Sequence, residues 1–154
     1  MRQTARSLRR VTPRYVPRPD DATALQTAFE DAGRILARMP GKGLRPADTG
    51  SSWPPFVREV MQAYGYDEAR PRSATASNRE IEQMGEVYAW VGLLPHHRYV
   101  LRRILQLRSQ IDPASDRHRY SWRHIARIVG CNAVSARRWH GDALRLVLVA
   151  LHEH

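Results

Sequence analysis

Two adjacent arginines, Arg137 and Arg138, are the side chains of this sequence best suited to reading a base. Val134 and Ser135 precede them in a segment whose apolar residues recur at helical spacing. A guanidinium donates two parallel hydrogen bonds to O6 and N7 of guanine, and an aliphatic side chain contacts a thymine methyl. A serine hydroxyl reaches a base edge or a phosphate. We therefore predict that these four residues contact base edges in the major groove of double-stranded DNA.

Four other polar or cationic side chains precede or begin that segment. Arg123, His124 and Arg127 lie in a shorter helical segment, and Asn132 stands where the second segment starts. In a helix-turn-helix the first helix crosses the sugar-phosphate backbone, and contacts there position a protein without reading sequence. We therefore predict phosphate contacts for these four residues.

The residues for a sharp turn between the two segments are present. Ser121 and Asn132 are of the types that cap helices. Ala126 is small enough for two helices to cross closely, and four residues later Gly130 can adopt the left-handed conformation of a reversal. This spacing predicts a helix-turn-helix. An ordinary helical hairpin with solvated arginines is the alternative.

Helical spacing also predicts which residues of these two helices are buried. The residues expected to be buried are Trp122, Ile125, Ala126, Ile128 and Val129, followed by Ala136, Trp139, Ala143, Leu144 and Val147. The residues expected to face outward near the start of the second helix are Ala133, Val134, Ser135, Arg137, Arg138 and His140. We expect the apolar run 146–151 to enter the core, with pairing to another subunit as the alternative.

The charge of the chain is segregated along its length. The 154 residues carry a formal net charge of +10. Residues 1–19 contain six arginines and no acid, and residues 98–145 contain eleven arginines against three aspartates, whereas residues 20–97 carry a net charge of −3. A codon bias towards arginine would not separate the charge in this way. The two basic blocks favour a polyanionic partner.

Three parts are predicted along the chain: a disordered arginine-rich arm over 1–19, a helical N-terminal part over 20–92, and a helix-turn-helix DNA-binding part over 93–154. Besides the two helices above, apolar spacing and capping residues predict helices over 21–39, 52–65, 78–91 and 95–109. The polar stretch 110–119 predicts a flexible connector. Because no segment alternates apolar and polar residues with period two, we predict an all-α fold.

The sequence lacks the features of several other classes of protein. The single cysteine, Cys131, excludes an intramolecular disulfide and any two-cysteine zinc site. The histidines are not combined with carboxylates at the spacing of a helical zinc site, and no serine lies in a nucleophile elbow. The longest apolar run is far shorter than the roughly 18 residues that cross a bilayer. We expect no metal, no cofactor, no enzymatic activity and no contact with a membrane.

The C-terminal part resembles the fourth region of sigma factors and the phage regulators that share that domain. The resemblance covers about residues 93–151 and depends on Leu94-Pro95, on Arg98, Val100 and Leu101, on the run from Trp122 to Gly130, and on Ala143-Leu144. The connector over 110–119 is longer than is usual in that family. Most of residues 20–151 also resembles an uncharacterised phage and prophage family, through Ser52-Trp53-Pro54, residues 63–66 and 68–70, residues 84–87 with Trp90, and residues 136–139.

These features predict a sequence-preferring protein that binds double-stranded DNA in a phage or prophage and regulates transcription. One alternative is the DNA-recognising small subunit of a genome-packaging terminase, with the terminase large subunit as its partner. Another is a sigma-like module that binds RNA polymerase. Homo-oligomerisation is open in each case. The expected location is the cytoplasm of a bacterial host, in association with the nucleoid.

Overall fold

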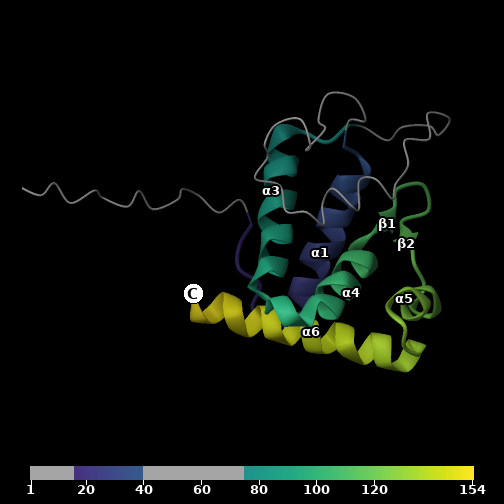
Figure 1. Ribbon diagram of the computed structural model, residues 1–154. Coiled ribbons are helices and arrows are strands. Elements are labelled where there is room, and N and C mark those ends of the chain that lie inside the picture. The colour runs from purple at the N-terminus through teal and green to yellow at the C-terminus, as the bar shows by residue number, and fades with distance from the viewer. Residues whose placement is uncertain (1–15, 40–74) are drawn as a thin grey trace, which may run out of the picture.

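The structure is a computed structural model that describes residues 16–39 and 75–154. Within these ranges the chain is predominantly helical, which confirms the predicted all-α class (Figure 1). The elements in chain order are α1 (Ala22–Ala37), α3 (Asn78–Ala89), the 3-10 helices η1 (Trp90–Leu93) and η2 (His96–Arg98), α4 (Tyr99–Ser109), β1 (Ile111–Asp112), β2 (Arg117–His118), α5 (Trp122–Val129) and α6 (Ala133–Glu153). The helix predicted over 52–65 and residues 1–15 of the predicted arm lie outside the described residues.

Side-chain caps fix the starts of α1 and α3. The carboxylate of Asp21 accepts a hydrogen bond from the N–H of Ala24 at 2.7 Å. Ser77 and Glu80 form the expected capping box. Arg38, at the end of α1, donates to Glu80 at 2.5 Å. The hydrogen bond from Arg38, followed by that from the Ser77 backbone, lowers the pKa of Glu80 to about 2.

Two predicted helix boundaries are wrong by a few residues. The helix expected over 78–91 is α-helical only to Ala89 and then continues as η1. The helix expected to begin at Pro95 begins with η2, and its α-helical part starts at Tyr99. The break falls at Leu94, which has the extended backbone (ψ 140°) that a residue before proline prefers.

The long helix α6 lies across one end of the group formed by α1, α3 and α4 (Figure 1). Its C-terminal half supplies Val147 and Leu151 to the main core, so the expected burial of the terminal apolar run is confirmed at these two positions. The expectation is wrong for Leu146 and Val149, which face away from the core and are 38% and 54% exposed. Tyr88 and Trp90 are buried in the same core. The main core therefore holds one half of α6 and leaves its N-terminal half to pack elsewhere.

The predicted flexible connector is wrong, because residues 111–118 form an antiparallel hairpin. Ile111 pairs with His118 and Asp112 with Arg117. The N–H of Asp116 donates to the carbonyl oxygen of Asp112 at 2.7 Å, and Asp116 has φ 54°. Asp112 also accepts through its carboxylate from Ser115 at 3.0 Å. Strands of two residues are too short to show the alternation that identifies a strand in a sequence.

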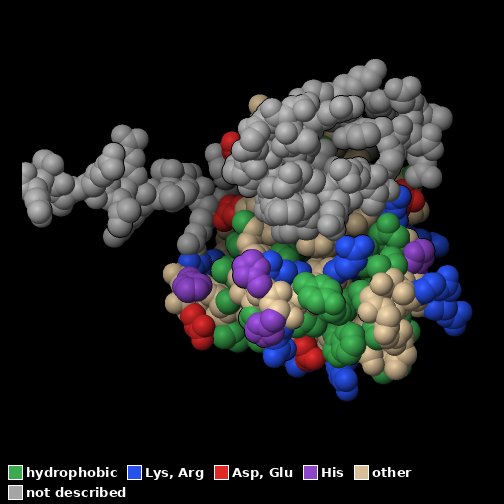
Figure 2. All heavy atoms as spheres, in the orientation of Figure 1, with side chains coloured by type: hydrophobic (Ala, Val, Ile, Leu, Met, Phe, Trp, Pro, Cys, Tyr) green, Lys and Arg blue, Asp and Glu red, His purple; other side chains and the backbone are tan. Residues whose placement is uncertain are grey.

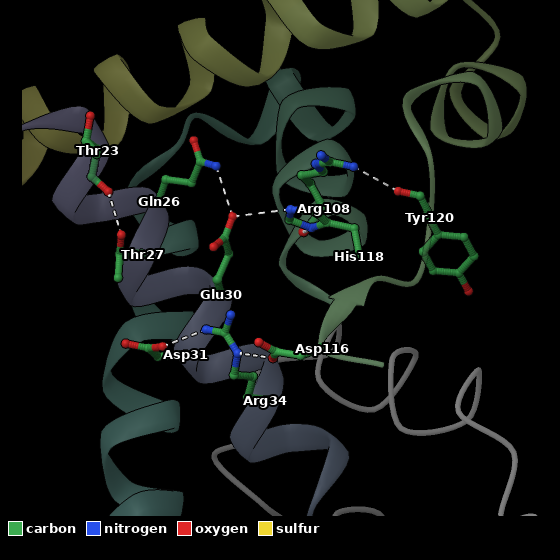
Figure 3. A network of polar contacts seen from close by, with 10 residues as sticks. All are labelled: Thr23, Gln26, Thr27, Glu30, Asp31, Arg34, Arg108, Asp116, His118 and Tyr120. Carbon is green, nitrogen blue, oxygen red and sulfur yellow. Dashed lines mark hydrogen bonds and ion pairs between the residues drawn. The ribbon is translucent and has the colours of Figure 1, made fainter. Parts of the chain in front are cut away.

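The hairpin is fixed to α1 by two pairs of side chains (Figure 3). Arg34 Nε donates to the carboxylate of Asp116 at 2.7 Å, a hydrogen bond that raises the pKa of Arg34. Nε2 of His118 lies 3.4 Å from the carboxylate of Glu30. Glu30 is held in turn by Gln26, whose amide donates to it at 2.9 Å. Two side chains of α1, Arg34 and Glu30, therefore hold residues 111–118 in one conformation.

The helix α1 approaches the end of α4 very closely at Gly33. A Cβ atom at this position would lie 1.7 Å from the carbonyl oxygen of Ser109 and 2.7 Å from its carbonyl carbon. The hydroxyl of Ser109 also forms a hydrogen bond with the phenol of Tyr88 at 3.0 Å and donates to the carbonyl oxygen of Gln106 at 2.7 Å. The end of α4 is therefore held by α1 and α3 together.

We predict that Gly33→Ala destabilises the protein by about 2 kcal/mol or more, because a backbone carbonyl must move to admit the methyl group. The matched control is Gly85→Ala in α3, where a Cβ meets no atom within 4 Å. Replacing that helical glycine should be neutral or stabilising by up to about 1 kcal/mol. Urea unfolding followed by circular dichroism measures both. Equal unfolding midpoints for the two variants would disprove the close approach.

Candidate nucleic-acid interface

The turn between α5 and α6 has the geometry that its residue types predict. Ser121 caps α5 by accepting from the N–H of His124 at 3.2 Å. Gly130 ends α5 in the left-handed region at φ 79°, and its N–H donates to the carbonyl oxygen of Ala126 at 2.9 Å. Asn132 caps α6 by accepting from the N–H of Ser135 at 2.7 Å. The three residues 130–132 therefore join two helices that are each capped at the N-terminus.

A second hydrophobic cluster holds these helices against α4. Its buried members are Ile104 and Leu107 from α4, Ile125 and Ala126 from α5, and Ala136 from α6. Ala126 is buried between α5 and α6, as its predicted role in a close crossing requires, and Ala136 is buried in the same cluster. Three helices therefore share a small core, and the opposite sides of α5 and α6 are left exposed.

The four predicted base contacts lie together on the first two turns of α6. Arg137 and Arg138 are exposed, and Ser135 is half-buried. Val134 is 80% exposed, the largest exposure of any large hydrophobic side chain in the described residues. An apolar side chain, a hydroxyl and two guanidinium groups are therefore presented by the N-terminal end of one helix.

The four predicted phosphate contacts are also exposed. Arg123, His124 and Arg127 lie on α5, and Asn132 lies in the turn. The side-chain oxygen of Asn132 is used as the cap of α6, which leaves its amide N–H groups for an external acceptor. None of the four is buried in either core cluster.

The surface around these residues is basic. No aspartate or glutamate occurs between Arg117 and Gly141, a stretch with six arginines. Figure 2 shows Lys and Arg side chains gathered along the edge of the molecule that is formed by the hairpin and α5. The positive charge that is concentrated in one part of the sequence is therefore also concentrated on one part of the surface.

Two predictions about which residues face outward are wrong. His140 was expected outward, yet it is only 7% exposed and packs against Trp122, with ring centroids 5.1 Å apart. Burial, followed by the nearby charges of Arg108 and His118, lowers the pKa of His140 to about 4. Ile128 was expected to be buried, yet it is 39% exposed. Which side of each helix is covered depends on the neighbouring helices that pack against it, and the helical repeat within one segment does not contain that information.

Arg108 of α4 is a positioning residue that the sequence does not reveal. Its guanidinium lies 4.3 Å from the ring centroid of Trp122 and donates to the carbonyl oxygen of Tyr120 at 3.0 Å (Figure 3). Burial lowers its pKa; the charge of Glu30 opposes this shift, and the charge of Arg137 adds to it. In the sequence, Arg108 is one of eleven arginines in a basic block and carries no distinguishing signal. It fixes the segment that leads into α5.

In the part of the chain that the structure describes, no three His, Cys, Asp or Glu side chains are grouped as ligands for a metal ion. No helix within the described ranges combines the length and apolar character needed to span a bilayer.

We predict that His140 makes the protein less stable in mild acid. The unfolded chain protonates this histidine near pKa 6.5, whereas the folded protein keeps it neutral down to about 4. The folded state binds fewer protons between these values, so its stability falls as pH decreases through this range, by about 2 kcal/mol from pH 7 to pH 5.

Urea unfolding at the two pH values measures this loss. In His140→Leu the same pH step should cost about 2 kcal/mol less than in the wild type. If wild type and His140→Leu respond equally to pH, the buried imidazole is not neutral in the folded protein.

The comparison with known proteins adds a family and no activity. A family model described as "Domain of unknown function (DUF6362)" matches residues 37–147. The matched range runs from the end of α1 into the C-terminal half of α6 and so contains the whole candidate interface. No curated protein and no solved structure matches the chain. Because the match covers well over half of its length, the chain belongs to the family of the domain of unknown function DUF6362.

Proposed function

We propose that this protein binds double-stranded DNA with sequence preference, using α5 and α6 as a helix-turn-helix, and that it regulates transcription in a phage or prophage. The observation that carries the proposal is the surface of the first two turns of α6. There an 80% exposed Val134 stands beside Arg137 and Arg138, in a stretch without acidic residues.

A single exposed apolar side chain is common on protein surfaces and does not identify a binding site by itself. Val134 is informative because other parts of α6 hold the helix in place. The C-terminal half of α6 is buried in the main core, and Ala136 is buried against α5. The N-terminal turns are therefore held rigidly. The major groove is about 12 Å wide and admits one α-helix, and it exposes thymine methyl groups together with guanine acceptors.

In this proposal the two helices make different kinds of contact with DNA. α6 supplies the side chains that match base edges, and α5 supplies Arg123 and Arg127, which match phosphates. A helical hairpin that only faces solvent could carry aspartate or glutamate on this surface, yet neither occurs between Arg117 and Gly141. The regulatory role is supported by the resemblance of residues 93–151 to the fourth region of sigma factors and the phage regulators that share it.

The proposal is tested by selection from random duplexes with the full chain at near-physiological salt. We expect a preferred site that binds roughly a thousandfold or more tightly than scrambled duplex. Absence of duplex binding would overturn the proposal, and co-purification with RNA polymerase in that case would establish the sigma-like module. Mass in solution separates the remaining readings: a monomer or dimer supports regulation, and a ring of many subunits supports packaging.

We predict different defects for arginines on the two helices. Arg138→Ala should cost about 1–3 kcal/mol on the selected site and flatten base preference, because a base contact is lost. Arg123→Ala should weaken selected and scrambled duplexes alike and lower the slope of log K against log salt by about one. Fluorescence anisotropy titrations over a series of salt concentrations measure both. Equal losses on both duplexes for Arg138→Ala would show that Arg138 does not read bases.

A further inference from the structure

The hairpin β1–β2 has two different faces. Residues paired directly across an antiparallel ladder share a face, and successive residues alternate between faces. Ile111, which is buried, therefore shares the inner face with His118. Arg117 and Arg119 flank His118 and are both exposed, so they occupy the outer face. The N–H of Arg119 donates to the carbonyl oxygen of Gln110 at 2.9 Å, which holds the backbone directly after β2.

The contacts of His118 with α4 and α1 fix the orientation of the hairpin. Nδ1 of His118 lies 2.9 Å from the carbonyl oxygen of Arg108, and its Nε2 lies 3.4 Å from the carboxylate of Glu30 (Figure 3). With the middle residue held between α4 and α1, the residues on each side of it must point away from both helices. The orientation of the two arginines therefore follows from buried contacts.

The acidic side chains of the hairpin are already engaged. The carboxylate of Asp112 accepts from the N–H of Ala114 at 3.2 Å and from the hydroxyl of Ser115 at 3.0 Å. The carboxylate of Asp116 accepts from Arg34 on α1. Asp112 pairs with Arg117 across the ladder, but its carboxylate is directed into the turn, and the carboxylate of Asp116 is directed towards α1.

This outer face continues the basic surface of α5. Two residues separate Arg119 from α5, and its guanidinium lies 5.8 Å from the ring centroid of Tyr120, which is the first of them. Tyr120 is itself held by Arg108 through its carbonyl oxygen. The hairpin and α5 are thus adjoining parts of one edge (Figures 1 and 2).

We propose that the hairpin is a second backbone-binding element, in which Arg117 and Arg119 contact phosphates of the duplex that receives α6. The proposal rests on the proposed function and extends the interface beyond the helix-turn-helix. Because the backbone of the hairpin is already ordered, these contacts cost less conformational entropy than they would on a flexible connector. Phosphate contacts carry no base information, so the hairpin raises affinity for every duplex equally.

The test is the double variant Arg117→Gln/Arg119→Gln in the full chain, titrated against selected and scrambled duplexes over a series of salt concentrations. Two lost phosphate contacts lower the magnitude of the slope of log K against log salt by about 1.8. The ratio of the two affinities stays at its wild-type value. The matched control Arg79→Gln/Arg98→Gln removes two charges from exposed residues of α3 and η2 and keeps the wild-type slope.

Arg117→Lys/Arg119→Lys keeps the charge and is expected to keep the slope, which separates lost charge from a damaged hairpin. Equal slopes for the Gln variant and the Arg79/Arg98 control would overturn the inference and leave the proposed function standing. A fall in the affinity ratio would also overturn it, because the arginines would then read bases. If the wild type binds no duplex, the proposed function fails and the hairpin contact fails with it.

Discussion

The packing of this protein depends on a backbone contact that only glycine permits. At Gly33 the helix α1 meets the carbonyl group of Ser109, and no side chain can stand between them. This contact fixes where α4 ends, and the hairpin starts two residues later. The hairpin is then fixed to α1 a second time through Asp116. The start of α5 is therefore set by α1, which lies almost ninety residues earlier in the sequence.

Local features of the fold were predictable because their causes are local. The capping box at Ser77, the left-handed Gly130 and the Asn132 cap each involve residues within a few positions of one another. The exposure of Arg137 and Arg138 followed in the same way from their spacing along one helix. Such features require only the geometry of a helix and its ends.

The features that escaped prediction are held by residues far apart in the sequence. The hairpin depends on Arg34 and Glu30 of α1, so its own polar sequence gave only the expectation of a flexible connector. His140 is buried because Trp122 covers it, although its spacing placed it beside two exposed arginines. In the sequence, Gly33 is simply a glycine within a helix, and only the position of the Ser109 carbonyl group shows why a side chain is excluded there. Long-range packing decides each of these cases.

Asp116 must satisfy two demands at once. Its backbone adopts φ 54°, a conformation that glycine, asparagine and aspartate tolerate better than other residues. Its carboxylate must also accept the guanidinium of Arg34. Glycine meets only the first demand and glutamate only the second. Replacing Asp116 therefore loses either the conformation of the turn or the ion pair that joins the hairpin to Arg34 of α1.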